Sequence, residues 1–250
     1  LTVENCVWNN YGDQFLVQDT VSSILVTGNV FAGDPFIAGP KYHLVFKNTQ
    51  CIANVIGNQF DSLSKTNGLA SVYLENTAKP GVIFNNTFVN NAGIAIHIVH
   101  SNIAAITHNI EENTFIFNKN DIKITHQNTS VVTNYDILEN TFRDLQVVDG
   151  VNNYHIQADA VNTEYFYIHR NYFKALETGT GTGNYAIVIT RPATAINWST
   201  VRIRNNIFEK FAGFGIRLDN QATDIAAAKW LVLNNQFQNF SGKGVVLYQC

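Results

Sequence analysis

The sequence predicts an all-β solenoid, in which the 250-residue chain winds through about nine coils with a period of about 29 residues. Three observations lead to this prediction. A short motif recurs along the whole chain, short strand-like segments follow one another without a helical period, and asparagine is unusually abundant, with 33 residues. We therefore expect a single domain covering residues 1–250.

Composition excludes several other classes of protein. The apolar fraction of 46% is enough for a core, which argues against disorder. Charged residues make up 14%, against about 25% in typical globular proteins, and the net charge is -3. No basic stripe indicates nucleic-acid binding, no apolar run approaches the ~18 residues of a membrane span, and three cysteines are too few for a disulfide scaffold.

The repeated motif is an apolar-alternating strand followed by Asn, any residue and Phe. A clear copy is Val82-Ile83-Phe84-Asn85-Asn86-Thr87-Phe88, and a weaker first copy is Val3-Glu4-Asn5-Cys6-Val7. We take these asparagines as the repeat markers: Asn5, Asn29, Asn58, Asn86, Asn113, Asn140, Asn171, Asn206 and Asn235.

Asparagine suits the corner of a coil because it tolerates the left-handed conformation and bonds to nearby backbone. In a stack of coils its amide can also bond to the same residue one coil away. The Phe two residues later is expected to enter the core and form an aromatic ladder. Trp8, Trp198 and Trp230 look isolated from this pattern.

Each period also contains a second short strand, such as Gly93-Ile94-Ala95-Ile96-His97-Ile98. The two longest periods carry the insertions, and segments 177–184 and 191–200 are expected to be exposed loops. One coil cannot bury its apolar side alone, so stacking must create the core.

These motifs resemble the right-handed parallel β-helix proteins of the pectin-lyase-like superfamily. The string Ile-x-Ile-x-Asn-Asn-x-Phe followed by Gly-Ile-x-Ile is similar to their generic repeat across essentially the whole chain. The resemblance implies a right-handed parallel β-helix. The superfamily includes polysaccharide lyases, hydrolases, epimerases, phage tailspikes and non-catalytic surface proteins, so the fold does not select one function.

Alternation along the second strands predicts which side chains point outward. Aligning the strands by their apolar pairs, with Tyr154 and Ile156 inward in the sixth coil, places a group of titratable residues on one face. Four of the seven histidines fall there, with other polar residues around them: His97, His100, His126 and His155, flanked by Tyr73, Lys123, Arg191, Arg217, Glu75, Gln157, Asp159 and Asp219. Clustering of titratable groups in a charge-poor chain marks a candidate functional site.

The residue types fit β-elimination on a uronate polymer, which needs a base, an acid and a cation beside the carboxylate. We expect His126 or His155 as the base, Tyr73 or Lys123 as the proton donor, and Arg191 or Arg217 as the carboxylate clamp. Substrate contacts are expected from His97, His100, Glu75, Gln157, Asp159, Asp219 and, by stacking on a sugar ring, Trp198.

Alternative interpretations remain open at this point. The outward residues can be ordinary solvated surface, and the protein can be a non-catalytic adhesive β-helix or a tailspike segment. No ligand spacing supports a metal site, no cofactor is expected, and calcium alone is left open. A hydrolase would need paired carboxylates, for which only Glu75 with a distant Asp is available.

The expected partner is a polysaccharide, most simply an acidic one met outside the cell or at its surface. The chain contains no methionine and its ends read as bare strands, which leads us to expect flanking sequence, capping domains or a homotrimer that covers the open edges.

Overall fold

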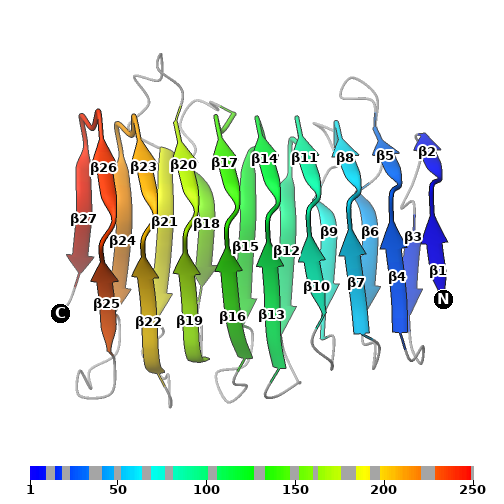
Figure 1. The fold of residues 1–250 in the computed structure, drawn as a ribbon, viewed down its shortest axis with the longest axis horizontal. Helices are drawn as coiled ribbons and strands as arrows, with labels where there is room; N and C mark the ends of the chain where they lie inside the picture. The colour runs from blue at the N-terminus through cyan, green and yellow to red at the C-terminus, as the bar shows by residue number, and fades with distance from the viewer. Residues whose placement is uncertain are drawn as a thin grey trace.

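The computed structural model describes residues 1–9, 15–18, 23–33, 41–47, 52–63, 69–76, 81–100, 106–126, 133–146, 152–159, 163–175, 184–191, 198–220 and 229–248. These residues form 27 strands and no helix, arranged as three parallel sheets of nine strands each. Figure 1 shows the strands of each sheet side by side along one axis, with the N-terminus at one end and the last strands at the other. The predicted all-β solenoid is confirmed.

Sheet A contains the strand that precedes each marker asparagine. Its members in spatial order are β1 (Thr2–Glu4), β4 (Ser23–Thr27), β7 (Ile52–Ile56), β10 (Val82–Phe84), β13 (Ile106–Glu111), β16 (Thr133–Leu138), β19 (Thr163–His169), β22 (Trp198–Arg204) and β25 (Trp230–Leu233).

Sheet B contains the short strand that follows the asparagine and carries the phenylalanine. Its members are β2 (Val7–Asn9), β5 (Val30–Ala32), β8 (Gln59–Asp61), β11 (Thr87–Val89), β14 (Thr114–Ile116), β17 (Thr141–Arg143), β20 (Tyr172–Lys174), β23 (Ile207–Glu209) and β26 (Gln236–Gln238).

Sheet C contains the second strand of each period. Its members are β3 (Phe15–Gln18), β6 (Tyr42–Lys47), β9 (Ala70–Glu75), β12 (Ile94–His100), β15 (Asn120–His126), β18 (Asn153–Asp159), β21 (Asn184–Arg191), β24 (Phe214–Asn220) and β27 (Lys243–Tyr248).

The coil is right-handed. In Figure 1 the chain rises along sheets A and B in front, returns along the paler sheet C behind, and advances from the N-terminal to the C-terminal end. This hand is the one that strand twist favours for parallel crossovers.

The corner between sheets A and B is held by a ladder of buried asparagines. Asn113, for example, donates from Nδ2 to the carbonyl oxygens of Ile83 and Glu111, and its backbone N–H donates to Oδ1 of Asn140 at 2.9 Å. The ladder runs through Asn29, Asn58, Asn86, Asn113, Asn140, Asn171, Asn206 and Asn235. The predicted corner chemistry is therefore present.

The first coil differs by one residue from the predicted position of its marker asparagine. Cys6, not Asn5, occupies the ladder position, because the Cys6 N–H donates to Oδ1 of Asn29 at 2.9 Å. Asn5 has a φ of 53° and belongs to the left-handed position that precedes each ladder residue, where Gly28 has a φ of 64°.

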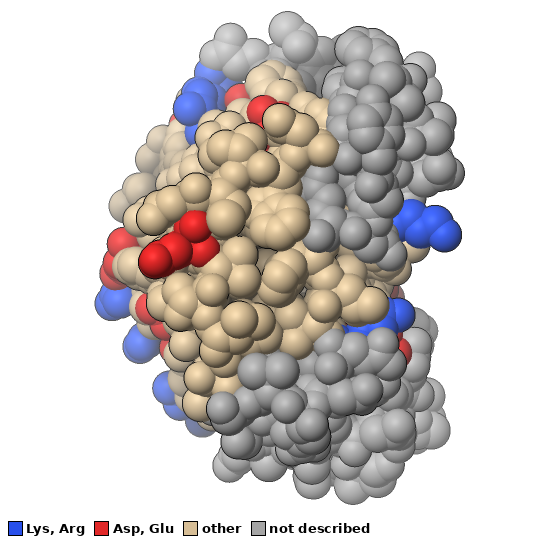
Figure 2. Space-filling view, turned by 90° about the vertical axis from the view of Figure 1, so that its right-hand side faces the viewer, with Lys and Arg blue, Asp and Glu red and all other residues tan. Residues whose placement is uncertain are grey.

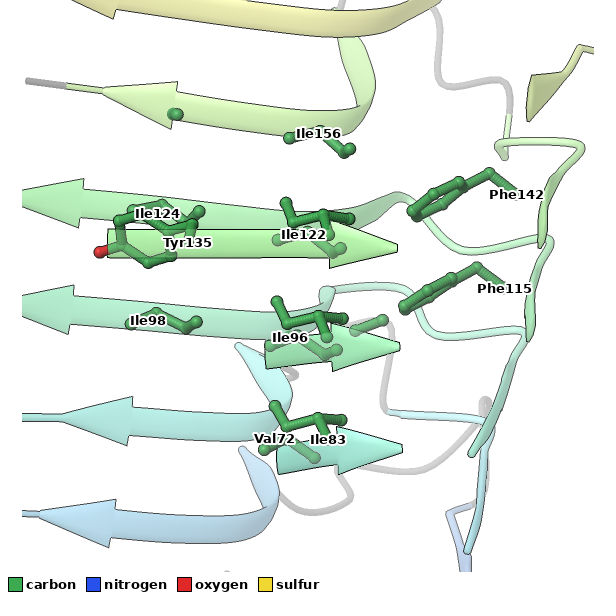
Figure 3. Close-up of a cluster of buried hydrophobic side chains, with 14 of the residues drawn as sticks. Val72, Ile83, Ile96, Ile98, Phe115, Ile122, Ile124, Tyr135, Phe142 and Ile156 are labelled. Atoms are coloured by element: carbon green, nitrogen blue, oxygen red, sulfur yellow. The ribbon is translucent and has the colours of Figure 1, made fainter. Parts of the chain in front are cut away.

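The phenylalanines of sheet B form the expected interior ladder. Phe115 stacks on Phe88 with ring centroids 5.0 Å apart and on Phe142 at 4.7 Å, with planes within 6° of parallel. Trp8 is not isolated as the sequence suggested, because it continues this ladder by stacking on Phe31 at 6.0 Å. Figure 3 shows the ladder beside the inward Ile and Val residues of sheets A and C.

Among the described residues, no helix has the length and apolar character needed to cross a membrane. Figure 2 looks onto the N-terminal end of the stack, where most of the described surface belongs to uncharged residues.

The segments expected to be loops, 177–184 and 191–200, overlap strands where the structure describes them. Asn184 begins β21, Arg191 ends it, and Trp198 begins β22. Residues 177–183 and 192–197 lie outside the described residues.

Candidate functional site

The outward face of sheet C carries two parallel columns of residues set by the strand register, and we call this surface the sheet C face. The first column is Leu16, Val45, Tyr73, His97, Lys123, Gln157, Val188, Arg217 and Val246. The second is Lys47, Glu75, Val99, Thr125, Asp159, Thr190, Asp219 and Tyr248. Neighbours in a column are about 4.8 Å apart.

The expected position of His155 on this face is wrong. Ile122 pairs with Ile156 and Lys123 with Gln157, so the sixth coil is displaced by two residues from the sequence alignment. The inward residues of β18 are Ile156 and Ala158, and His155 is fully buried. Tyr154, which was expected inward, is half-buried.

His155 is instead part of a polar pair inside the stack. Its Nδ1 lies 2.5 Å from Oδ2 of Asp121, which is also fully buried and accepts a hydrogen bond from Nδ2 of Asn118 at 2.8 Å. Burial raises the pKa of Asp121, while the hydrogen bond from His155 lowers it. Phe142, Phe173 and Phe211 surround the imidazole and hold it away from any substrate on the surface.

His100 and His126 are also interior, contrary to the expectation. His100 Nε2 lies 3.1 Å from His108 Nε2, and His126 Nε2 lies 2.9 Å from the Tyr135 hydroxyl. Burial and the two neighbouring histidines lower the pKa of His100 to about 2, and burial lowers that of His108 to about 4. The four side chains fill the space between the end of sheet C and sheet A and are inaccessible to a polymer.

His97 is the histidine that does lie on the sheet C face, and its neighbours are those the sequence predicted. Tyr73 lies one coil before it, with ring centroids 5.4 Å apart, and Lys123 lies one coil after it. Burial and the charge of Lys123 lower the pKa of His97 to about 4, so the imidazole is neutral at pH 7. Burial and the adjacent Glu75 raise the pKa of Tyr73, which keeps the phenol protonated.

The described cations of the sheet C face are balanced by carboxylates. Lys47 lies 3.3 Å from Glu75. Lys123 lies 3.9 Å from Asp159, which Gln157 also contacts at 2.9 Å. Arg217 lies 3.3 Å from Asp219, with its guanidinium over Tyr248. The described part of this face thus offers many polar groups but little net charge.

The site residues do not form one compact centre. Arg217 is four strands from His97 along the column, which corresponds to about 19 Å. Arg217 therefore cannot clamp the carboxylate of a sugar held at His97. Arg191 pairs with Asn220 through the backbone of β21, but its side chain and that of Trp198 lie outside the described residues.

Sequence reasoning missed an aromatic column beside the polar one. Tyr154, Tyr185 and Phe214 stack in successive coils, with ring centroids 5.4 and 5.2 Å apart and planes 20° from parallel. All three are half-buried. The sequence does contain a signal for this column, since each of the three residues stands two positions before an inward isoleucine. The expected register of the sixth coil was wrong by two residues, and it placed Tyr154 in the core instead.

The described residues contain no group of three or more His, Cys, Asp or Glu side chains arranged to hold a metal ion. Of Tyr73, His97 and Lys123, only His97 has a side chain of these four types. The carboxylates on this face are paired with cations.

The fold defines the class of the protein as a parallel β-helix with a polar and aromatic face along sheet C. No protein-family model matches the chain, and comparisons with curated proteins and with solved structures give no significant match.

Proposed function

We propose that the sheet C face binds an extended polysaccharide lying along the axis of the β-helix. The observation that carries the proposal is the aromatic column of Tyr154, Tyr185 and Phe214 beside the polar column containing Gln157 and Arg217. Carbohydrates present both apolar C–H faces and hydroxyl groups, and aromatic rings beside amide, carboxylate and guanidinium groups match both.

The charge balance of the face favours a polysaccharide with few charges. Lys123 and Arg217 are both engaged by aspartates, so an acidic polymer would have to displace those contacts. Because the columns of the sheet C face run along the axis with about 4.8 Å between neighbouring residues, the face suits an extended linear polymer better than a compact ligand. The resemblance to pectin-lyase-like proteins supports a polysaccharide as the ligand, without favouring a neutral one. The proposed setting is extracellular or at the cell surface, where such polymers occur.

Affinity electrophoresis tests this proposal, with neutral glucans and xylan compared with pectate and alginate. We expect retardation on at least one neutral polymer, and about tenfold weaker retention for Tyr185→Ala, corresponding to ~1.4 kcal/mol. Tyr167→Ala, which alters a half-buried tyrosine on sheet A, is the matched control and should bind normally. Equal retention of both variants, or no retention on any polymer, would refute binding at this face.

β-Elimination on a uronate polymer is a second candidate function, favoured by one observation. Tyr73, His97 and Lys123 are in register on adjacent strands, and His97 is neutral at pH 7. In this proposal the His97 imidazole removes the C5 proton, Tyr73 protonates the leaving oxygen and Lys123 neutralises the carboxylate. It replaces the bases first expected, His126 and His155, which are buried.

The product of this reaction absorbs ultraviolet light, so incubation with alginate, pectate, chondroitin or hyaluronan gives a direct assay. Activity should disappear in His97→Gln and persist in His169→Gln, which changes a histidine of sheet A. Unchanged activity in His97→Gln would rule out this centre. A protein that binds but produces no absorbance would be the non-catalytic β-helix.

A further inference from the structure

A second outward surface, on sheet A, lies apart from the proposed polysaccharide face. We call the outward residues next to the asparagine corner the sheet A edge column. In coil order the later part of this column reads Phe84, Glu111, Leu138, His169, Arg204 and Leu233. It has an apolar residue at each end, an acidic residue near the first end and a basic residue near the second.

The described residues neutralise the acidic part of this surface only partly. Asp136 is engaged by His169 at 2.6 Å and Glu139 by Arg170 at 2.7 Å. Glu111 and its neighbour Glu112 have no ion pair among the described residues. Partial burial and the surrounding Asp136, Glu112 and Glu139 raise the pKa of Glu111, and His169 offsets this only in part.

The basic part lies three strands further along the same column. Neither Arg202 nor Arg204 has an ion pair within the described residues. The Arg202 guanidinium lies over the Tyr167 ring at 5.0 Å, and its Nε is buried without a hydrogen-bond partner there. Arg204 is exposed. Glu111 and Arg204 are separated by about 14 Å along the column, which prevents an ion pair within one molecule.

A second copy turned by a two-fold axis parallel to the strands would satisfy both parts at once. Such an axis, placed between β16 and β19, reverses the coil order and keeps each column opposite itself. Glu111 then faces the second copy's Arg204, and Phe84 faces its Leu233, which is 48% exposed. In the adjoining outward column, Asn109 faces Arg202 of the second copy. A two-fold interface needs this self-complementarity.

We infer that the outward face of sheet A is a docking surface for a second copy of this chain, with the two β-helix axes antiparallel. The pairs Glu111–Arg204 and Phe84–Leu233 each occur twice in the dimer because of the two-fold axis. The sheet C face lies on the other side of each coil, so the dimer leaves both proposed polysaccharide faces free.

Sedimentation velocity over a protein concentration series tests the inference. We expect a concentration-dependent dimer whose dissociation constant rises at least tenfold between 0.05 and 0.5 M salt, since screening weakens exposed ion pairs. Glu111→Arg and Arg204→Glu should each weaken dimerisation at least tenfold. The double variant Glu111→Arg/Arg204→Glu should restore it, because the swapped charges again face each other. Lys119→Glu is the control for charge alone.

The double variant separates a docking defect from a folding defect, and thermal unfolding of each variant checks the fold directly. A monomer at all concentrations, or a trimer, would overturn the inference. So would a dimer that ignores the single charge reversals, or one that the double variant fails to restore.

Discussion

The asparagines of the ladder show how one residue type determines the corner of a coil. The Asn113 side chain donates to the backbone of its own coil and of the preceding one, and its Oδ1 accepts from the N–H and Nδ2 of Asn86. A buried side chain with this many partners cannot be replaced by one lacking donor and acceptor, because the backbone groups it serves would be left unpaired. The abundance of asparagine thus reflects corner chemistry.

We predict that Asn113→Ala lowers the free energy of unfolding by roughly 3–5 kcal/mol, since two carbonyl oxygens and one backbone N–H lose a buried partner. Urea denaturation followed by circular dichroism measures the change. Thr114→Ala, on the outward side of the same coil, is the control and should change stability by less than about 0.5 kcal/mol. Similar losses in the two variants would contradict the role of the ladder.

At the scale of a strand, the interior of sheet C accepts polar residues where two neighbouring strands supply complementary groups. Asp121 in β15 and His155 in β18 face each other in the same buried column, where other coils have Ala95 and Ala186. This pair explains why the sixth coil was misaligned. Apolar alternation favoured Tyr154 as an inward residue, whereas His155 can be inward because its partner lies on the previous strand.

We predict that Asp121→Ala lowers the free energy of unfolding by about 3 kcal/mol or more, because it leaves His155 buried without its partner. In a His155→Phe background the same substitution should cost clearly less, since the imidazole is then absent. A double-mutant cycle by urea denaturation gives the coupling between them. Equal costs in both backgrounds would show that the two side chains do not stabilise each other.

At the scale of the whole molecule, the buried histidines link stability to pH. Burial lowers the pKa of His43 to about 3, and His100 and His108 have values of about 2 and 4, against about 6.5 in an unfolded chain. The unfolded state therefore binds more protons below pH 6.5, and the folded state loses stability as the pH falls from 6.5 towards 4. The raised pKa of buried Asp121 acts in the opposite direction.

We predict that the urea midpoint decreases steadily from pH 7 to pH 4.5. His43→Leu removes one of these groups, whose two ring nitrogens have no hydrogen-bond partner among the described residues. Its unfolding free energy should fall less steeply, by about 1.4 kcal/mol per pH unit, while stability at pH 7 is retained or improved. Identical slopes for His43→Leu and the parent protein would exclude His43 as a contributor.

The solenoid, its period, the asparagine corner and the phenylalanine ladder could all be predicted from the sequence. These features repeat in every coil after the first, where Cys6 and Trp8 take the two positions, so the copies support the same register. Tyr73, His97 and Lys123 were also placed correctly on one face, because each lies between two inward apolar residues of its strand. The interior positions of His100, His126 and His155 could not be predicted in this way. Their burial depends on partners on other strands, namely His108, Tyr135 and Asp121. Because alternation within one strand cannot reveal a buried polar partner on another, the coils were predictable and the site only partly so.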